Sequence, residues 1–340
     1  INDGSMLFLL HLASKMERPE KGGGRVAIVL SGSPLFNGGA GSGESEIRRW
    51  LLENDLVEAI IALPTEIFFR TGIGTYLWIL SNKKPENRQG KVQLINATSL
   101  WVSIKNEGNK RRMISEEQIR QIADIYAAAE TDELSRMVDY KTFGYRRIKV
   151  LRPLRMSLLV DEEGMEKLRE EKAWLKLSKE QQSTWQDAIG NHYGMSKPFA
   201  WAELFATSTA EANPVVGKVG KTFIKALISA FGVKDPEGEP VTDSNGEIIP
   251  DPDLTDHENV PLTMNIKDYL AKEVLPHLPD AYIDETFRDD LDKEIGRVGF
   301  EINFNRFFYK YVPPRNLVDI DAELKQVETE IADLLGEVTE

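Results

Sequence analysis

A glycine-rich loop that leads into a helical pattern is the first place in this sequence where chemistry could occur. Residues 38–45 read GGAGSGES, and the helical pattern EIRRWLLEND follows at residues 46–55. A phosphate-binding loop needs a strand that runs directly into the glycines and a lysine that reaches the phosphates. Here the preceding apolar run ends at Leu30, eight residues before Gly38, and Glu44 stands where the lysine would be. We therefore predict a flexible turn before a helix, in which Glu44 complements the positive helix N-terminus, and no nucleotide site.

Other catalytic arrangements are missing from the sequence. The four histidines are scattered and lack the spacing of metal ligands. Asp289 and Asp290 are adjacent, but they lie in a charged run of the kind that usually forms a solvated surface. The chain contains no cysteine, which excludes disulfides, thiolate metal sites and cysteine nucleophiles.

Two adjacent aromatic residues lie in a loop between two apolar runs, in the stretch ALPTEIFFRTGIGTYLWILSN at residues 62–82. Phe68 and Phe69 are followed by Arg70 and by two glycines that permit a tight backbone path. Loops at strand ends are where α/β sheets place their ligands. Two interpretations remain open, because the rings could also fill the core below the loop.

A basic extended stretch, FGYRRIKVLRPLRM at residues 143–156, is a second candidate. Residues 1–155 hold 23 Lys/Arg against 18 Asp/Glu, whereas residues 156–340 hold 19 against 37. This asymmetry permits the first part to face a polyanion, although the net charge is −13. The basic side chains could contact phosphates, or they could be ordinary surface charge or contact the acidic region. The candidates are Arg70, Arg146, Arg147, Lys149, Arg152 and Arg155.

Hydrophobic patterning predicts the elements that would position these residues. Helical patterns at about 3–17 and 44–55 alternate with β-branched apolar runs, which favours an α/β sheet with a right-handed crossover. The segment 74–97 has no room for a crossover helix, so it should close with antiparallel strands. The expected strands are at residues 22–30, 56–64, 74–82 and 91–97.

Beyond Ser115, a plausible helix N-cap, the pattern becomes mostly helical. A loop rich in Pro, Gly and Asp interrupts it at residues 234–256. The last helix, about 317–336, carries an apolar stripe with heptad spacing, which is suited to packing against another helix of a partner or of its own domain. The stripe consists of Leu317, Ile320, Leu324, Val327, Ile331 and Leu334.

The stretch from GGGRVAIVL to WILSNKKP, residues 22–85, closely resembles the modification (M) subunit of type I restriction–modification systems. These subunits are DNA adenine-N6 methyltransferases that use S-adenosylmethionine. The resemblance continues through FGYRRIKVLRPLR and GFEINFNRFFYKYVPPR. It implies an α/β chain with the C-terminal part of a Rossmann-like, S-adenosylmethionine-dependent methyltransferase sheet that ends in an antiparallel hairpin. A mostly α-helical C-terminal region follows.

Two motifs of that family are absent from this sequence, namely the glycine-rich cofactor motif and the catalytic Asn-Pro-Pro-Phe/Tyr motif. The near-matches NPVV at residue 213 and VPPRN at residue 312 do not follow a suitable strand. The resemblance therefore implies a chain that starts in mid-domain, without the N-terminal half and without catalytic, cofactor-binding or metal-binding residues. We expect S-adenosylmethionine to bind the complete subunit but not this chain alone, which should be inactive by itself. The alternative function is a non-catalytic, truncated assembly module that docks a specificity subunit.

The resemblance also implies roles and partners. Methylation of adenine N6 within a duplex requires a flipped base, which related enzymes stack on an aromatic side chain in the loop before the last hairpin strand. Position matching assigns Phe68 to this role, with Phe69 as the alternative. The implied partners are a specificity (S) subunit, a second M subunit and double-stranded DNA, with a restriction (R) subunit left open. The implied location is cytoplasmic, without a membrane, and the terminal helix is expected to dock on helical connectors of the S subunit.

Four consecutive regions are predicted along the chain. They are the C-terminal part of the methyltransferase domain (1–114), a connecting helix and basic segment (115–156), a helical region with an acidic loop at 234–256 (157–316), and a partner-docking helix (317–340).

Overall fold

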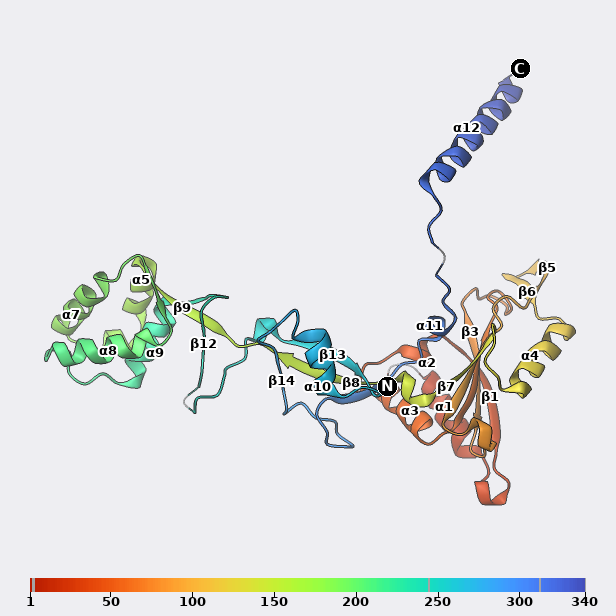
Figure 1. Ribbon diagram of the computed structural model, residues 1–340, viewed down its shortest axis with the longest axis horizontal. Coiled ribbons are helices and arrows are strands. Elements are labelled where there is room, and N and C mark those ends of the chain that lie inside the picture. The colour runs from red at the N-terminus through yellow and green to blue at the C-terminus, as the bar shows by residue number, and fades with distance from the viewer. Residues whose placement is uncertain (2–3, 244, 312, 340) are drawn as a thin grey trace. The chain divides into compact units, whose positions relative to one another are not determined.

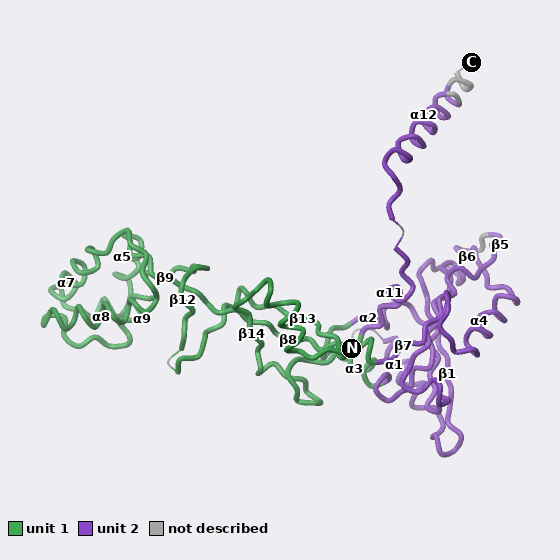
Figure 2. The backbone as a smooth tube through the Cα atoms, in the orientation of Figure 1, with its two compact units in different colours: residues 1, 38–50, 141–300 green, residues 2–37, 51–140, 301–340 purple. Residues whose placement is uncertain are grey.

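The structure is a computed structural model that describes residues 1, 4–243, 245–311 and 313–339, without the side chains of 106, 107, 333 and 336–339. Val312, in the near-match VPPRN, therefore lies outside the described residues. The chain divides into two compact units (Figures 1 and 2). Unit 1 contains residues 1, 38–50 and 141–300, and unit 2 contains residues 2–37, 51–140 and 301–340. Each unit combines segments that are distant in sequence, whereas the predicted regions are consecutive.

The main sheet of unit 2 has five strands. Its order is β1 (Arg25–Ser31), β3 (Thr75–Ser81), β2 (Val57–Leu63), β4 (Lys91–Asn96) and β7 (Ser135–Asp139). Every residue of β2 is buried, as expected for a mostly apolar run in the middle of a sheet. The exception in polarity is Glu58, whose carboxylate pairs with Arg25 Nε at 2.9 Å. The pair β2–β4 is parallel, and β3 runs antiparallel to both of its neighbours. The four strands expected from the sequence are therefore present.

The antiparallel strand expected in segment 74–97 is present, because β3 runs antiparallel to both of its neighbours and follows β2 directly in the chain. β3 does not pair with β4; it lies between β1 and β2 and forms antiparallel ladders with both. In this central position the side chains of Trp78 and Leu80 are completely buried. Both edges of β3 therefore have a ladder partner, which satisfies its backbone hydrogen-bonding groups.

Short elements extend unit 2 beyond the sheet. The hairpin of β5 (Val102–Glu107) and β6 (Lys110–Met113) follows β4, and α4 (Glu116–Ala128) follows the hairpin. Ser115 caps α4 as predicted: its Oγ accepts a hydrogen bond from the Gln118 amide at 3.3 Å, and the Gln118 side chain accepts one from the Ser115 amide at 3.0 Å. The remaining helices are α1 (Ser5–Lys15), α2 (Ser33–Phe36), α11 (Phe304–Phe308) and α12 (Leu317–Thr339).

A helical cluster in unit 1 has its own core. Trp185, 1% exposed, lies with its ring centroid 4.6 Å from that of Phe223 and 5.9 Å from that of Phe205. The helices are α5 (Glu162–Glu170), α6 (Lys172–Leu175), α7 (Lys179–Gly190), α8 (Trp201–Ala212) and α9 (Lys221–Phe231). The strands beside them are β9 (Arg155–Val160), β10 (Met195–Pro198), β11 (Gly232–Lys234) and β12 (Glu239–Pro240).

A second sheet of unit 1 is built on β8 (Gly144–Leu151). Its other strands are β13 (Asp256–Pro261), β14 (Tyr282–Ile283) and β15 (Arg297–Phe300), all antiparallel to β8. These three strands lie in the region that the sequence predicted to be mostly helical. They are short, and they acquire a ladder only from a strand more than 100 residues earlier, so local sequence does not identify them. The remaining helices are α3 (Gly43–Glu53) and α10 (Ile266–Tyr269).

Candidate nucleic-acid interface

The loop between β2 and β3 presents aromatic side chains to solvent. Phe68 is 40% exposed and Phe69 is 59% exposed, so neither ring fills the core. The backbone of this loop is unusual, because Glu66 and Arg70 have positive φ angles of 61° and 60°. Non-glycine residues rarely adopt this conformation, so outside contacts must hold the loop in place.

The β5–β6 hairpin supplies those contacts through its backbone. The amide of Arg70 donates to the carbonyl of Gly108 at 2.8 Å. In return, the carbonyl of Glu66 accepts from the amides of Arg111 and Arg112 at 3.0 and 3.3 Å. Both positive-φ residues of the loop thus have a hydrogen-bonding partner in the hairpin, which fixes where Phe68 and Phe69 emerge.

Side chains add to this attachment. The guanidinium of Arg112 lies 4.1 Å from the ring centroid of Trp101 and donates from Nη1 to Thr65 Oγ1 at 2.9 Å. The Lys110 ammonium lies 5.0 Å from the centroid of Phe69. Cations over aromatic faces at these distances attract the ring. We call the set the aromatic–basic cluster; it comprises Phe68, Phe69, Arg70, Trp101, Lys110, Arg111 and Arg112.

The hairpin's part in this cluster was not predicted. The available signal was EGNKRRM at residues 107–113, a Gly-Asn turn followed by three cations. Its location beside the loop depends on pairing between segments some 40 residues apart in the sequence, which no local pattern shows.

Two of the predicted phosphate-binding residues, Arg152 and Arg155, form ion pairs within unit 1. Arg152 Nε donates to Asp280 Oδ1 at 2.9 Å, and Arg155 Nε donates to Asp280 Oδ2 at 3.2 Å. The Arg152 hydrogen bond is the main reason that the pKa of the Asp280 carboxyl is lowered, and Arg155 adds to it. The sequence left open that these cations contact the acidic region of the chain, and Arg152 and Arg155 do so through Asp280.

The other cations of the basic stretch lie on β8. Arg146 Nη2 is 2.6 Å from Asp292 Oδ2, and Lys149 Nζ is 3.1 Å from Asp284 Oδ2. Arg147 lies opposite Asn259 on β13 and Arg297 on β15 in the sheet register. Phosphate contact by these residues stays a prediction, and the ion pairs disfavour it. Of the predicted cations, Arg70 is the one that belongs to the aromatic loop, next to Phe69 in the chain.

The glycine-rich loop is anchored, whereas the sequence predicted a flexible turn. Arg48, fully buried, donates from Nη2 to the Gly38 carbonyl at 3.0 Å and from Nε to the Phe300 carbonyl at 2.6 Å. Gly38 has a φ of +80°, and a Cβ there would lie 2.2 Å from Ser42 Oγ and 3.2 Å from a Glu44 carboxylate oxygen. The loop is folded on itself with a carboxylate beside it. These residues do not fit a phosphate or an S-adenosylmethionine site.

Asp289 is buried, and the predicted solvated surface was wrong at this residue. It is 3% exposed, and its Oδ1 accepts from Arg49 Nη1 at 3.0 Å. The amides of Leu291, Asp292 and Val298 also donate to its carboxylate. Burial alone would raise the pKa of this carboxyl, but the backbone amides and Arg49 outweigh it and lower the pKa to about 2. Asp289 thus holds the turn at residues 289–292 and the start of β15 through these hydrogen bonds.

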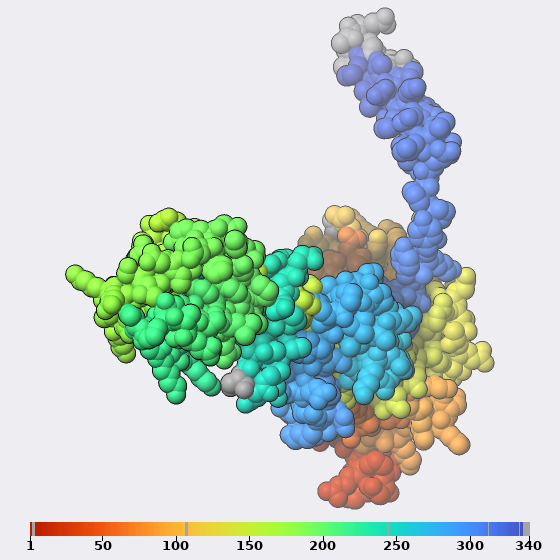
Figure 3. Space-filling view, turned by 60° about the vertical axis from the view of Figure 1, so that its left-hand side comes forward, coloured from red at the N-terminus to blue at the C-terminus, as the bar shows by residue number. Residues whose placement is uncertain are grey.

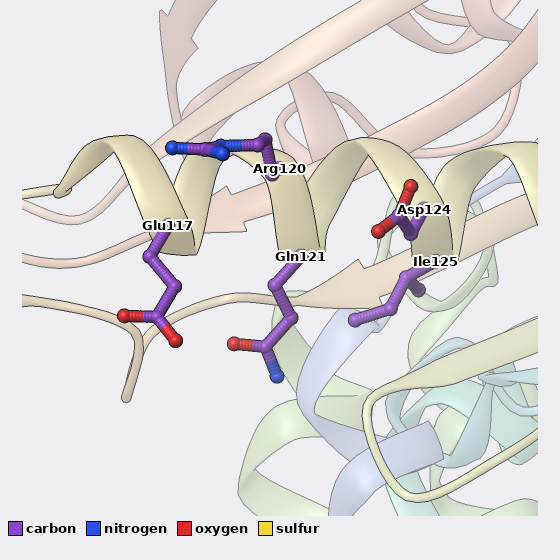
Figure 4. A pocket seen from close by; sticks show the side chains of 5 residues that line it. All are labelled: Glu117, Arg120, Gln121, Asp124 and Ile125. Carbon is purple, nitrogen blue, oxygen red and sulfur yellow. The ribbon is translucent and has the colours of Figure 1, made fainter.

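The surface hollow beside α4 is not a convincing site. It has a volume of about 600 Å³, and the side chains in Figure 4 come from a single helix. Its lining mixes charges of both signs with a neutral amide and an apolar side chain: Glu117, Arg120, Asp124, Gln121 and Ile125. Among the described residues, no group of His, Asp or Glu side chains could hold a metal ion. Within the same residues, no helix is both long enough and apolar enough to cross a membrane.

Comparisons with known proteins identify the first part of the chain. Residues 2–144 match the family described as N-6 DNA Methylase. The MjaVII and MjaIX methylase subunits of type I restriction enzymes from Methanocaldococcus jannaschii are 40% and 34% identical to the chain over 116 and 110 residues, respectively. These matches cover 34% and 32% of this chain and 19% of each relative. The chain thus spans about a fifth of the length of these relatives.

Among solved structures, the type I restriction-modification methyltransferase subunit from Streptococcus thermophilus matches with 28% identity and a TM-score of 0.36. That match covers 42% of this chain and 28% of the other. Residues 2–144, less than half of the chain, are thus similar to the class of DNA N6-methylases. The relatives matched within that class are methylase subunits of type I restriction enzymes.

Proposed function

We propose that this chain is part of a modification subunit that transfers a methyl group from S-adenosylmethionine to adenine N6 in DNA. It works with a specificity subunit that reads the target and with a second modification subunit. The family match over residues 2–144 is the observation that carries the proposal. The exposure of Phe68 in a loop that is fixed by hydrogen bonds supports it, because a stacking residue must be both accessible and held in place.

In this proposal the cofactor is not held by the described residues of this chain. The glycine-rich loop closes on Ser42 and carries Glu44, and the sequence lacks the family's cofactor and catalytic motifs. In the complete subunit, S-adenosylmethionine supplies the methyl group from a site built by other residues. The chain alone is therefore inactive in this proposal, and its own contribution is to stack the base and to contact partners.

Phe68→Ala in the complete subunit, assembled with its specificity subunit, tests this proposal. Loss of stacking of about 1–3 kcal/mol should reduce methyl transfer to target DNA by about 5- to 150-fold. The measurement is incorporation of labelled methyl groups at saturating cofactor. Ile73→Ala, in the same loop and 58% exposed, is the matched control and should retain activity.

Thermal unfolding of the same variants separates stacking from packing. Phe68→Ala should unfold at the wild-type temperature, because its ring is 40% exposed. Full activity together with a stability loss of several kcal/mol would identify a core phenylalanine and refute the stacking role.

A docking function for α12 is a second proposal, and it is also the function of a non-catalytic assembly module. Figure 3 shows this terminal helix in blue. Its apolar stripe is largely in solvent: Leu317, Leu324, Ile331 and Leu334 are 75%, 56%, 52% and 62% exposed. Covering these apolar side chains with a partner helix removes them from water, which lowers the free energy and favours association. The specificity subunit is the proposed partner.

A further inference from the structure

We propose that the β5–β6 hairpin is a DNA-backbone arm, in which Lys110 and Arg111 contact phosphates next to the base that stacks on Phe68 or Phe69. This inference rests on the proposed function and adds to it a phosphate-binding surface outside the basic stretch of residues 143–156. The ligand class is a DNA duplex with one unstacked base.

Available positive charge is the first reason. Residues 102–113 carry four cations and one carboxylate, within a chain of net charge −13. Arg70, Lys105, Lys110 and Arg111 form no ion pair within the described part of the chain. Most cations of the basic stretch, by contrast, already hold carboxylates. An unpaired cation that meets a phosphate releases a condensed counterion, whereas a paired one must first give up its carboxylate.

Proximity to the exposed rings is the second reason. The Lys110 ammonium lies 5.0 Å from the Phe69 ring centroid. Arg111, the next residue of β6, is exposed on the opposite face of the strand and extends the positive charge of the hairpin there. A nucleotide presents a flat base and an anionic phosphate side by side, and proteins that hold an unstacked base combine aromatic platforms with cations for this reason. The cations of the hairpin and the exposed rings therefore match the phosphate and the base of one nucleotide.

Rigidity is the third reason. Three backbone hydrogen bonds join the hairpin to the loop, from the amides of Arg70, Arg111 and Arg112. Arg112 itself is engaged with Trp101 and Thr65, so it acts as a positioning residue and not as a phosphate contact. The arm and the aromatic loop form one piece, so a phosphate bound by the arm fixes the register of the base on the rings. Such contacts orient the DNA without reading its sequence.

The test uses this 340-residue chain and two fluorescent duplexes, one fully paired and one with a single adenine opposite an abasic site. Anisotropy gives the association constant over a range of salt concentrations. For Lys110→Ala/Arg111→Ala, the slope of log K against log salt should become shallower by about 1.8, because about 0.9 is expected for each phosphate contact. Phe69→Ala should keep the wild-type slope and lose preference for the unpaired adenine.

Three controls make the result specific. Lys172→Ala/Lys176→Ala removes two exposed cations of α6 and its C-cap and should behave like wild type. Lys110→Arg/Arg111→Lys keeps both charges and should restore the slope. Circular dichroism and thermal unfolding of the alanine variant should match wild type, because the Arg111 backbone bond survives truncation of its side chain.

An unchanged slope in the alanine variant overturns the inference, and so does a wild-type chain that binds neither duplex. A slope loss that Lys110→Arg/Arg111→Lys fails to restore also overturns it, because charge would then not be the cause. Methyl transfer by the complete complex is measured separately, so the methylase proposal can stand when the arm fails, and the reverse also holds.

Discussion

Asp289 shows how much a single buried residue can determine in this chain. Its carboxylate, 3% exposed, accepts hydrogen bonds from Arg49, from two backbone amides of the following turn and from the Val298 amide of β15. A buried carboxylate remains ionised only when donors replace the lost water. At this scale the sequence left open whether Phe68 and Phe69 fill the core or face solvent, and the structure shows both rings exposed. The prediction for Asp289 was wrong, because an Asp-Asp pair in a charged run looks the same in sequence whether its carboxylates are solvated or bind the backbone of a turn.

We expect Asp289→Asn to destabilise the chain by about 3 kcal/mol, because it removes the charge that compensates buried Arg49. Urea unfolding at neutral pH measures this loss. The adjacent Asp290→Asn, at an exposed position, is the control and should have little effect. Equal effects of the two substitutions would contradict a specific role for Asp289.

The same residue predicts a pH dependence. Because the folded-state pKa of Asp289 is lowered from 3.8 to about 2, its stabilising contribution is complete above about pH 4 and is lost as the pH falls towards 2. The free energy of unfolding of wild type should therefore fall more steeply across this window than that of Asp289→Asn. Parallel curves for the two proteins would refute the assignment.

At the scale of elements, apolar patterning identified most of the secondary structure but not its pairing. Four of the five strands of the main sheet, and α3, α4 and α12, were predicted from runs, caps and heptads, whereas β7 was not. The insertion of β3 between β1 and β2 was not, and neither was the attachment of the hairpin to the aromatic loop. Periodicity shows which face of an element is apolar, but pairing depends on which distant segment covers that face.

The exposed stripe of α12 leads to a prediction for this element. Leu324→Asp together with Ile331→Asp should abolish co-purification with the specificity subunit and leave the helical circular dichroism of the isolated chain nearly unchanged, because both side chains are exposed. Lys325→Asp/Thr329→Asp, outside the stripe, is the control and should preserve the complex. If the stripe variant unfolds the chain and loses the complex only for that reason, α12 belongs to the core and the docking proposal fails.

At the scale of the whole molecule, the two units have separate buried cores. The aromatic core around Trp185 lies in unit 1, and the apolar strands β2 and β3 lie in unit 2. The sequence indicated a change from an α/β pattern to a mostly helical pattern after residue 115, because local hydrophobic patterning changes there. It could not indicate that residues 38–50 belong with unit 1 and residues 301–340 with unit 2, because such long-range membership is decided by contacts such as the Arg48 hydrogen bond to Phe300.

Separate cores predict separate responses to a core mutation. Trp185→Ala should destabilise the helical cluster by about 3–5 kcal/mol, as for other large-to-small core substitutions. Hydrogen exchange should then accelerate at amides of α5 to α9 and stay at the wild-type rate in β2 and β3. Leu175→Ala, at a position 65% exposed, should change neither set. Equal acceleration in both units would show that they unfold together.

The insertion of β3 has a consequence for synthesis of the chain on the ribosome. β1 and β2 emerge first, yet the edges that both will offer to β3 stay open until residues 75–81 have left the exit tunnel. During that interval the nascent chain displays two apolar strand edges, of the kind that recruit foreign strands. When β3 arrives, it pairs with β1 and β2 and covers both open edges in one step.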